Sequence, residues 1–168
     1  RLESEGLLTV RPQVGTEVAP IDVDAVADGQ FVREALECRT VAMAAKAVAY
    51  TQARALKLKL TGDAELDAAR VTAVRHARPG VWIGVDGNQG FKPDSLEALM
   101  PALVEADIKL VEQPFARGRE ADHDGFSSPI PLAADESALC LADLAGLAGR
   151  VQVINIKLDK CGGLTEGL

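Results

Sequence analysis

The chain has 168 residues, 48% of them hydrophobic, which suits one domain with its own apolar core. Its formal net charge of −7 at pH 7 argues against binding to nucleic acid or to anionic membranes, since both attract basic surfaces. Three cysteines without metal-type spacing argue against a disulfide framework, so a reducing, cytoplasmic location is expected. No apolar run approaches the roughly 18 residues that a membrane helix needs.

The first fifty residues show little periodicity. Residues 1–19 contain Gly and Pro and are predicted to be a leader or the remnant of a preceding region, and residues 20–168 to form one domain. Residues 21–26 favour a short strand, and residues 31–52 favour a helix. Because the chain lacks an initiating Met and stops where a helix should begin, we expect it to be a piece of a longer protein.

Strands and helices then alternate. Residues 117–128 are polar and predict a loop with one helical turn. Alternation of this kind indicates parallel βαβ units, in either a barrel or an open doubly wound sheet. The predicted strands are 55–60, 81–86, 108–112, 130–135 and 151–157, and the predicted helices are 64–77, 93–106 and 139–147.

An ionisable residue ends each of these strands: Lys59, Asp86, Glu112, Asp135 and Lys157. They are 27, 26, 23 and 22 residues apart, about one βα unit each. The carboxyl ends of barrel strands meet at one mouth, where such barrels perform their chemistry, whereas an open sheet would not gather five consecutive strand ends. The sequence therefore predicts an α/β fold in the form of a (β/α) barrel.

Lys57 and Lys59 alternate with three leucines in residues 56–60, so the two lysines are expected on one strand face and the leucines on the other. Three carboxylates on neighbouring strands need a cation among them, and oxygen ligands favour Mg²⁺, with Mn²⁺ as the second choice. A partly desolvated lysine beside another cation has a lowered pKa and can act as a base. For any one of these acids alone, a helix cap or a solvated strand end would be a simpler interpretation than a metal ligand.

Five motifs together resemble the barrel of the enolase superfamily, and within it the muconate-lactonizing-enzyme subgroup and most closely the dipeptide epimerases. The resemblance covers about residues 55–168. It implies a partial TIM-type barrel in residues 20–168, roughly the first six βα units, without the capping domain and the last strands of the family. The motifs are Lys57-Leu58-Lys59 and residues 85–90, 111–114, 134–137 and 155–163.

The resemblance also implies roles for the strand-end residues. Asp86, Glu112 and Asp135 would bind Mg²⁺. Lys59 and Lys157 would be bases on opposite faces of a substrate, one removing a proton and the other returning it.

Four further residues complete the expected site. Lys57 would hold the substrate carboxylate electrostatically, and Lys160 is the rival of Lys157 for the role of second base. Asn88 and Glu136 would orient the metal ligands.

The activity implied is that of a Mg²⁺-dependent epimerase or racemase acting α to a carboxylate through a metal-stabilised enediolate, on a dipeptide or an N-acyl amino acid. Two alternatives stay open: an o-succinylbenzoate synthase or cycloisomerase of the same subgroup, and a non-catalytic truncated fragment. The expected partner is a small-molecule carboxylate substrate, and homo-oligomerisation of the full-length protein is left open.

Overall fold

The computed structural model describes residues 8–11, 15–18, 46, 48–49, 53–157 and 160–163. The predicted strand at 21–26 lies outside these residues. So does most of the predicted helix at 31–52, although the three residues of it that are described are helical.

Residues 1–19, predicted to be a leader or the remnant of a preceding region, include an antiparallel hairpin. It pairs β1 (Leu8–Arg11) with β2 (Gly15–Val18). Thr and Val are frequent in these two segments, and β-branched residues favour strands. Each segment is only four residues long, too short for its alternation to predict a strand.

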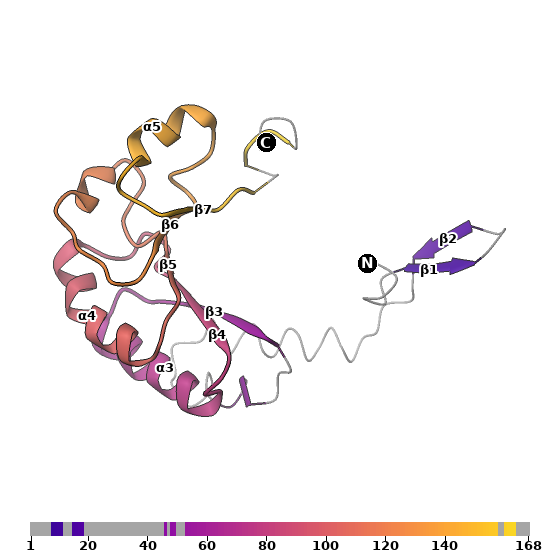
Figure 1. Ribbon diagram of the computed structural model, residues 1–168, viewed down its shortest axis with the longest axis horizontal. Coiled ribbons are helices and arrows are strands. Elements are labelled where there is room, and N and C mark those ends of the chain that lie inside the picture. The colour runs from indigo at the N-terminus through magenta and orange to yellow at the C-terminus, as the bar shows by residue number, and fades with distance from the viewer. Residues whose placement is uncertain are drawn as a thin grey trace.

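Five parallel strands form the sheet that positions the site (Figure 1). Each strand pairs with the next one in the chain, in the order β3–β4–β5–β6–β7 and without a reversal. This order is that of a barrel wall rather than of a doubly wound sheet, so the predicted α/β fold with a partial barrel is confirmed. The strands are β3 (Ala55–Lys59), β4 (Trp82–Asp86), β5 (Leu110–Glu112), β6 (Leu132–Ala134) and β7 (Val153–Ile154).

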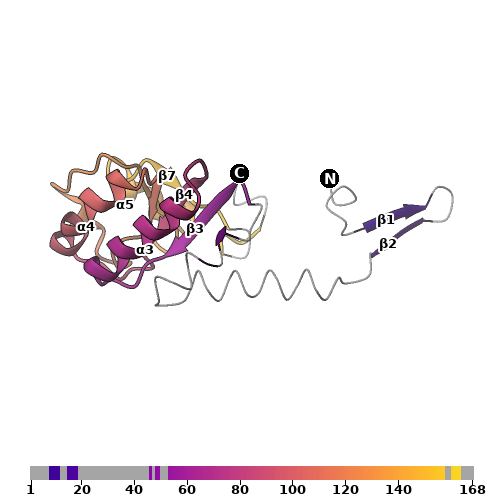
Figure 2. The ribbon, with the colours of Figure 1, turned by 90° about the horizontal axis from the view of Figure 1, so that it is seen from below.

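Two long helices lie on one side of this sheet (Figures 1 and 2). Helix α3 (Ala64–Ala77) has the predicted bounds and begins after Asp63, whose carboxylate accepts the N–H groups of Glu65 and Leu66. Helix α4 (Pro93–Glu105) begins with proline, which suits the first helical turn. No helix within the described residues is long and apolar enough to cross a membrane.

The segments after β5 and β6 contain shorter helices. The predicted helical turn in residues 117–128 is the 3₁₀ helix η1 (Glu120–His123). The predicted helix at 139–147 is shorter, with η2 (Leu141–Asp143) followed by α5 (Leu144–Leu147). It begins late because the Asp143 carboxylate accepts the N–H groups of Leu139 and Cys140 and holds them outside the helix.

The leucines of β3 face the helices, as predicted. Leu56 and Leu58 are 4% and 2% exposed, whereas Lys57 and Lys59 are exposed on the other face. Burying each leucine contributes about 1.5–3 kcal/mol. The partners of these leucines in the core are apolar side chains of the sheet and the helices, among them Val71, Val74, Ile83, Val85, Leu96, Leu99, Leu103 and Val111.

Arg75, near the end of α3, ties the sheet to the helices at the end of the strands away from the predicted site. Its Nε donates to the Ala106 carbonyl at 2.7 Å, and its Nη1 donates to the Val81 carbonyl at 2.8 Å. Its Nη2 donates to the Asp107 carbonyl at 3.1 Å. One guanidinium therefore joins α3, the start of β4 and the end of α4.

Candidate functional site

The sheet face opposite the helices, here called the inner face, carries the predicted site residues. In the sheet register Lys59 pairs with Asp86, Asp86 with Glu112, and Glu112 with Ala133. Paired residues of neighbouring strands point to the same face, and so do residues two apart in one strand. Lys57 and Lys59 therefore share the inner face with Asp86 and Glu112, and Asp135 follows Ala133 on that face.

Lys57 holds two of the carboxylates together. Its Nζ lies 3.1 Å from Asp86 Oδ2 and 2.7 Å from Glu112 Oε2, and these two acids are only 7% and 5% exposed. Burial alone would lower the pKa of Lys57. The hydrogen bond to Glu112 and the charges of both acids outweigh burial, so its pKa is raised. Lys57 is thus a fixed positive charge, which suits an electrostatic role better than that of a base.

Asp135 is shared by two lysines that follow β7. Lys157 Nζ donates to its Oδ2, and Lys160 Nζ donates to its Oδ1 at 2.9 Å. Asp135 is only 2% exposed, and burial alone would raise its pKa. The hydrogen bonds from Lys157 and Lys160 outweigh burial and hold the pKa of Asp135 below its usual value. The two lysines that the sequence analysis treated as rivals therefore lie at the same carboxylate.

Lys59 lies at the other flank of the site, on β3. Within the described part of the chain it has no ion-pair partner, and it is exposed. The loop that follows it is held by Asp67 of α3, which is completely buried. The Asp67 carboxylate accepts the N–H groups of Thr61 at 2.9 Å and of Gly62 at 3.1 Å. Asp67 thereby fixes the end of β3 and, with it, the position of Lys59.

Asn88 and Glu136, predicted to orient the acids, lie near or directly after an acid in the chain. Asn88 contacts Asp86 through its backbone N–H, at 3.0 Å from Oδ1, and its side chain makes no hydrogen bond within the described structure. Glu136 Oε1 lies 3.7 Å from Nζ of Lys160, the lysine that also donates to Asp135. Asn155, for which no role was predicted, also orients an acid, because its Nδ2 donates to Glu112 Oε1 at 3.0 Å. Its position two residues before Lys157, on the same strand face, is the signal that could have identified it.

Gln113 is a second residue to which no role was assigned, and it joins the ends of β5 and β6. Its side chain is buried and makes four hydrogen bonds. Oε1 accepts the N–H groups of Asp135 at 2.9 Å and Ser137 at 3.1 Å, and Nε2 donates to the Phe115 carbonyl and to Ser137 Oγ. Its backbone is left-handed, with φ of 39°. A side chain so fully bonded directly after Glu112 fixes the distance between two of the predicted metal ligands.

The donor chemistry of the acids fits a hard divalent cation, since Asp86, Glu112 and Asp135 are buried carboxylates at neighbouring strand ends. Asp86 and Glu112 already surround one positive charge, the Lys57 ammonium. Asp135 is engaged separately, and in the described residues no three acidic, His or Cys side chains converge into a metal-binding group. The structure therefore brings two of the three predicted ligands together and places the third beside Lys157 and Lys160.

Gln113→Leu is expected to lower the free energy of unfolding by about 3 kcal/mol, measured by urea denaturation. Loss of the amide leaves the buried N–H groups of Asp135 and Ser137 without an acceptor, at about 1–3 kcal/mol for each group. Gln89→Leu is the matched control, because Gln89 is also left-handed but is exposed and accepts one N–H. An equal effect of the two changes would contradict the role given to Gln113.

Asp135 is expected to make stability depend on pH in the acid range. Its folded pKa lies below the ordinary 3.8, so its ion pairs stabilise the fold fully above that pH and lose this effect as the pH falls through the lower folded value. Asp135→Asn should therefore cost about 3 kcal/mol at pH 6 and clearly less at pH 3, measured by urea denaturation at both values. Glu97→Gln, at an exposed position of α4, serves as the control. A cost that is the same at both pH values would refute this account.

Known proteins share this arrangement of strands. Residues 39–168 match the sequence profile of the family described as enolase C-terminal domain-like. Among curated relatives, the L-Ala-D/L-Glu epimerase of Escherichia coli (strain K12) is 38% identical over 126 residues, which cover 75% of this chain and 39% of that protein. An N-acetyl-D-glutamate racemase of a Pseudoalteromonas species is 44% identical over 111 residues, covering 66% of this chain and 35% of the racemase.

A solved structure agrees with the sequence relatives. The dipeptide epimerase of Enterococcus faecalis, in complex with Mg and the dipeptide L-Leu-L-Tyr, superposes with a TM-score of 0.70 at 34% identity, covering 75% of this chain and 38% of that one. The chain thus spans about two fifths of the length of these proteins. From the profile match over most of its residues and the parallel strands with acids at their ends, the chain belongs to the enolase C-terminal domain-like family of the enolase superfamily.

Proposed function

We propose that the protein is an epimerase or racemase that removes and returns the proton on the carbon next to a carboxylate group. The observation that carries this proposal is the order of charges on the inner face. Buried acids on β4, β5 and after β6 lie between lysines of β3 on one flank and lysines that follow β7 on the other. Two bases on opposite flanks can reach opposite faces of one carbon, which an inversion of configuration requires.

In this proposal Lys59 and Lys157 are the two bases. One of them, as a neutral amine, accepts the α-proton, and the other, as an ammonium, donates a proton to the opposite face. The free position of Lys59 supports its part, because no acid in the described structure holds it. Lys57 contributes a fixed positive charge beside the reacting carboxylate, consistent with its raised pKa.

Asp86, Glu112 and Asp135 are proposed to hold Mg²⁺, with Mn²⁺ as the alternative. When bound there, the cation would stabilise the negative charge that develops on the substrate carboxylate. The Mg-containing structure of the Enterococcus faecalis dipeptide epimerase supports this assignment. Asn155 keeps Glu112 oriented, and Gln113 keeps Asp135 at a set distance from it.

The substrate class proposed is dipeptides or N-acyl amino acids. The names of the two sequence relatives support it, since one acts on L-Ala-D/L-Glu and the other on N-acetyl-D-glutamate. In both compounds an amide nitrogen and a carboxylate flank the carbon that would exchange its proton.

The intact protein is expected to exchange the α-proton of such substrates for deuterium in D₂O, followed by ¹H NMR. Lys157→Ala should lower the exchange rate of one epimer about 10³-fold while the other epimer still exchanges. Lys59→Ala should lower the exchange rate of the other epimer instead. Each lysine faces one side of the carbon, so each variant retains the base for one epimer. Lys109→Ala, an exposed lysine before β5, is the control. If the unmodified protein exchanged no α-proton across a broad panel of dipeptides, the proposal would be wrong.

Mg²⁺ is expected to bind with 1:1 stoichiometry in calorimetry, and Asp135→Asn should weaken this binding at least tenfold. The reason is the loss of one of three charged oxygen ligands. Asp107→Asn removes an exposed acid that pairs only with Lys109 in the described structure and should leave the affinity unchanged. Equal affinity of the Asp135→Asn and Asp107→Asn variants would mean that Asp135 is not a ligand.

A further inference from the structure

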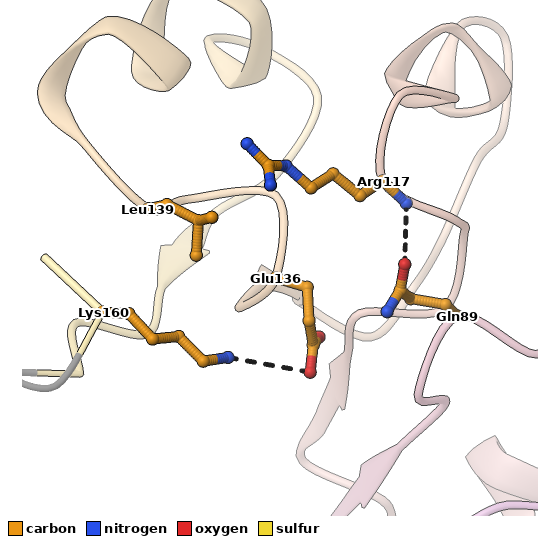
Figure 3. A pocket seen from close by; sticks show the side chains of 5 residues that line it. All are labelled: Gln89, Arg117, Glu136, Leu139 and Lys160. Atoms are coloured by element: carbon orange, nitrogen blue, oxygen red, sulfur yellow. Dashed lines mark hydrogen bonds and ion pairs between the residues drawn. The ribbon is translucent and has the colours of Figure 1, made fainter.

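A pocket of about 410 Å³ lies beside the buried acids, and here it is called the mouth pocket. Its size is in the range of about 300–1,000 Å³ that small-molecule sites occupy. The loops after β4, β5, β6 and β7 each contribute to it, so it opens at the same end of the sheet as the site. It is lined by Gln89, Arg117, Glu136, Leu139 and Lys160 (Figure 3).

Arg117 is the available cation of this pocket. Figure 3 shows its side chain extending toward Leu139, while its backbone N–H donates to Gln89 Oε1 at 3.0 Å. Among the described residues its guanidinium has no ion-pair partner. Lys160, by contrast, is already engaged with Asp135 and lies near Glu136.

The acids closest in sequence to Arg117 and Leu139 are occupied by other donors. Glu120 Oε1 accepts the Gly118 N–H and the Ser137 hydroxyl at 3.0 and 2.9 Å. Asp143 Oδ2 accepts two backbone N–H groups, at 2.9 and 3.0 Å. The charge of Arg117 helps to lower the pKa of both acids. Within the described residues, however, no carboxylate lies within ion-pair distance of its guanidinium, which can therefore pair with an incoming carboxylate.

Glu136 narrows the class of ligand. Its Oε2 atom is buried and has no hydrogen-bond partner in the described structure. A buried carboxylate oxygen without a donor is unfavourable, so a ligand that brings an N–H group would be stabilised there. An inorganic anion such as phosphate carries one to two negative charges at neutral pH and would be repelled by the Glu136 carboxylate. A carboxylate and an N–H group together are features of an amino-acid residue.

From these contacts we infer that the mouth pocket binds an acidic amino-acid residue of the substrate, with its side-chain carboxylate on Arg117. The guanidinium offers two parallel N–H groups to a carboxylate, and Leu139 gives the methylene groups of the side chain an apolar surface. This inference rests on the proposed function for the identity of the substrate. It adds that Arg117 determines the preference for acidic over neutral residues.

The inference can be tested by binding, without turnover. Calorimetry on the intact protein compares N-acetyl-L-glutamate with N-acetyl-L-glutamine, which differ only in the side-chain carboxylate. The unmodified protein should bind the glutamate compound more tightly, and Arg117→Met should weaken that binding at least tenfold and binding of the glutamine compound less than twofold. Arg119→Met is the matched control, since Arg119 lies in the same loop and pairs with Asp122. Inorganic phosphate should not compete.

The same variants separate this inference from the proposed function. With L-Ala-L-Glu and L-Ala-L-Gln as substrates, Arg117→Met should lower the ratio of their kcat/KM values at least tenfold. If the unmodified protein exchanges no α-proton, the proposed function fails, while the binding comparison still decides the role of Arg117. The inference is overturned if the unmodified protein does not prefer the glutamate compound, if Arg117→Met weakens both compounds equally or neither, or if phosphate competes.

Discussion

Three carboxylates buried at one end of a sheet can stay ionised only if positive charge lies beside each of them. Asp86, Glu112 and Asp135 are 7%, 5% and 2% exposed, and removing an ionised acid from water costs several kcal/mol unless it is paired. The structure meets this requirement with lysines, one held by the first two acids and two more on the third. The positions of the lysines are therefore set by the positions of the acids that they neutralise.

The same constraint links the site to the proposed chemistry. Oxygens that attract lysine ammonium groups also attract a hard divalent cation, so the same carboxylates suit the Mg²⁺ of the proposed function. Lys160 extends this network to the mouth pocket, because it reaches Asp135 and Glu136 together. A ligand in the mouth pocket and a ligand at the acids would thus both lie near the Lys160 side chain.

Much of this arrangement follows from periodicity in the sequence. Alternating leucines and lysines predicted the two faces of β3. The alternation of strands and helices predicted the parallel sheet, and the even spacing of ionisable strand-end residues predicted the barrel. Contacts between loops were beyond such reasoning, because they depend on how separate strand ends approach each other. Gln113 shows this best, since its amide serves N–H groups of a segment more than twenty residues later. The pairing of Asp135 with both Lys157 and Lys160 depends on side-chain reach, which strand alternation does not specify.

The alternation in β3 also bears on how this strand can change over time. Substitutions at Lys57 or Lys59 alter charge on the inner face and leave the leucine layer in place. A single inserted or deleted residue would instead reverse the direction of every side chain beyond it, placing ammonium groups among the helices and leucines in the mouth of the barrel. New activities on this sheet are thus accessible through point changes, whereas changes of length are confined to the loops between the strands.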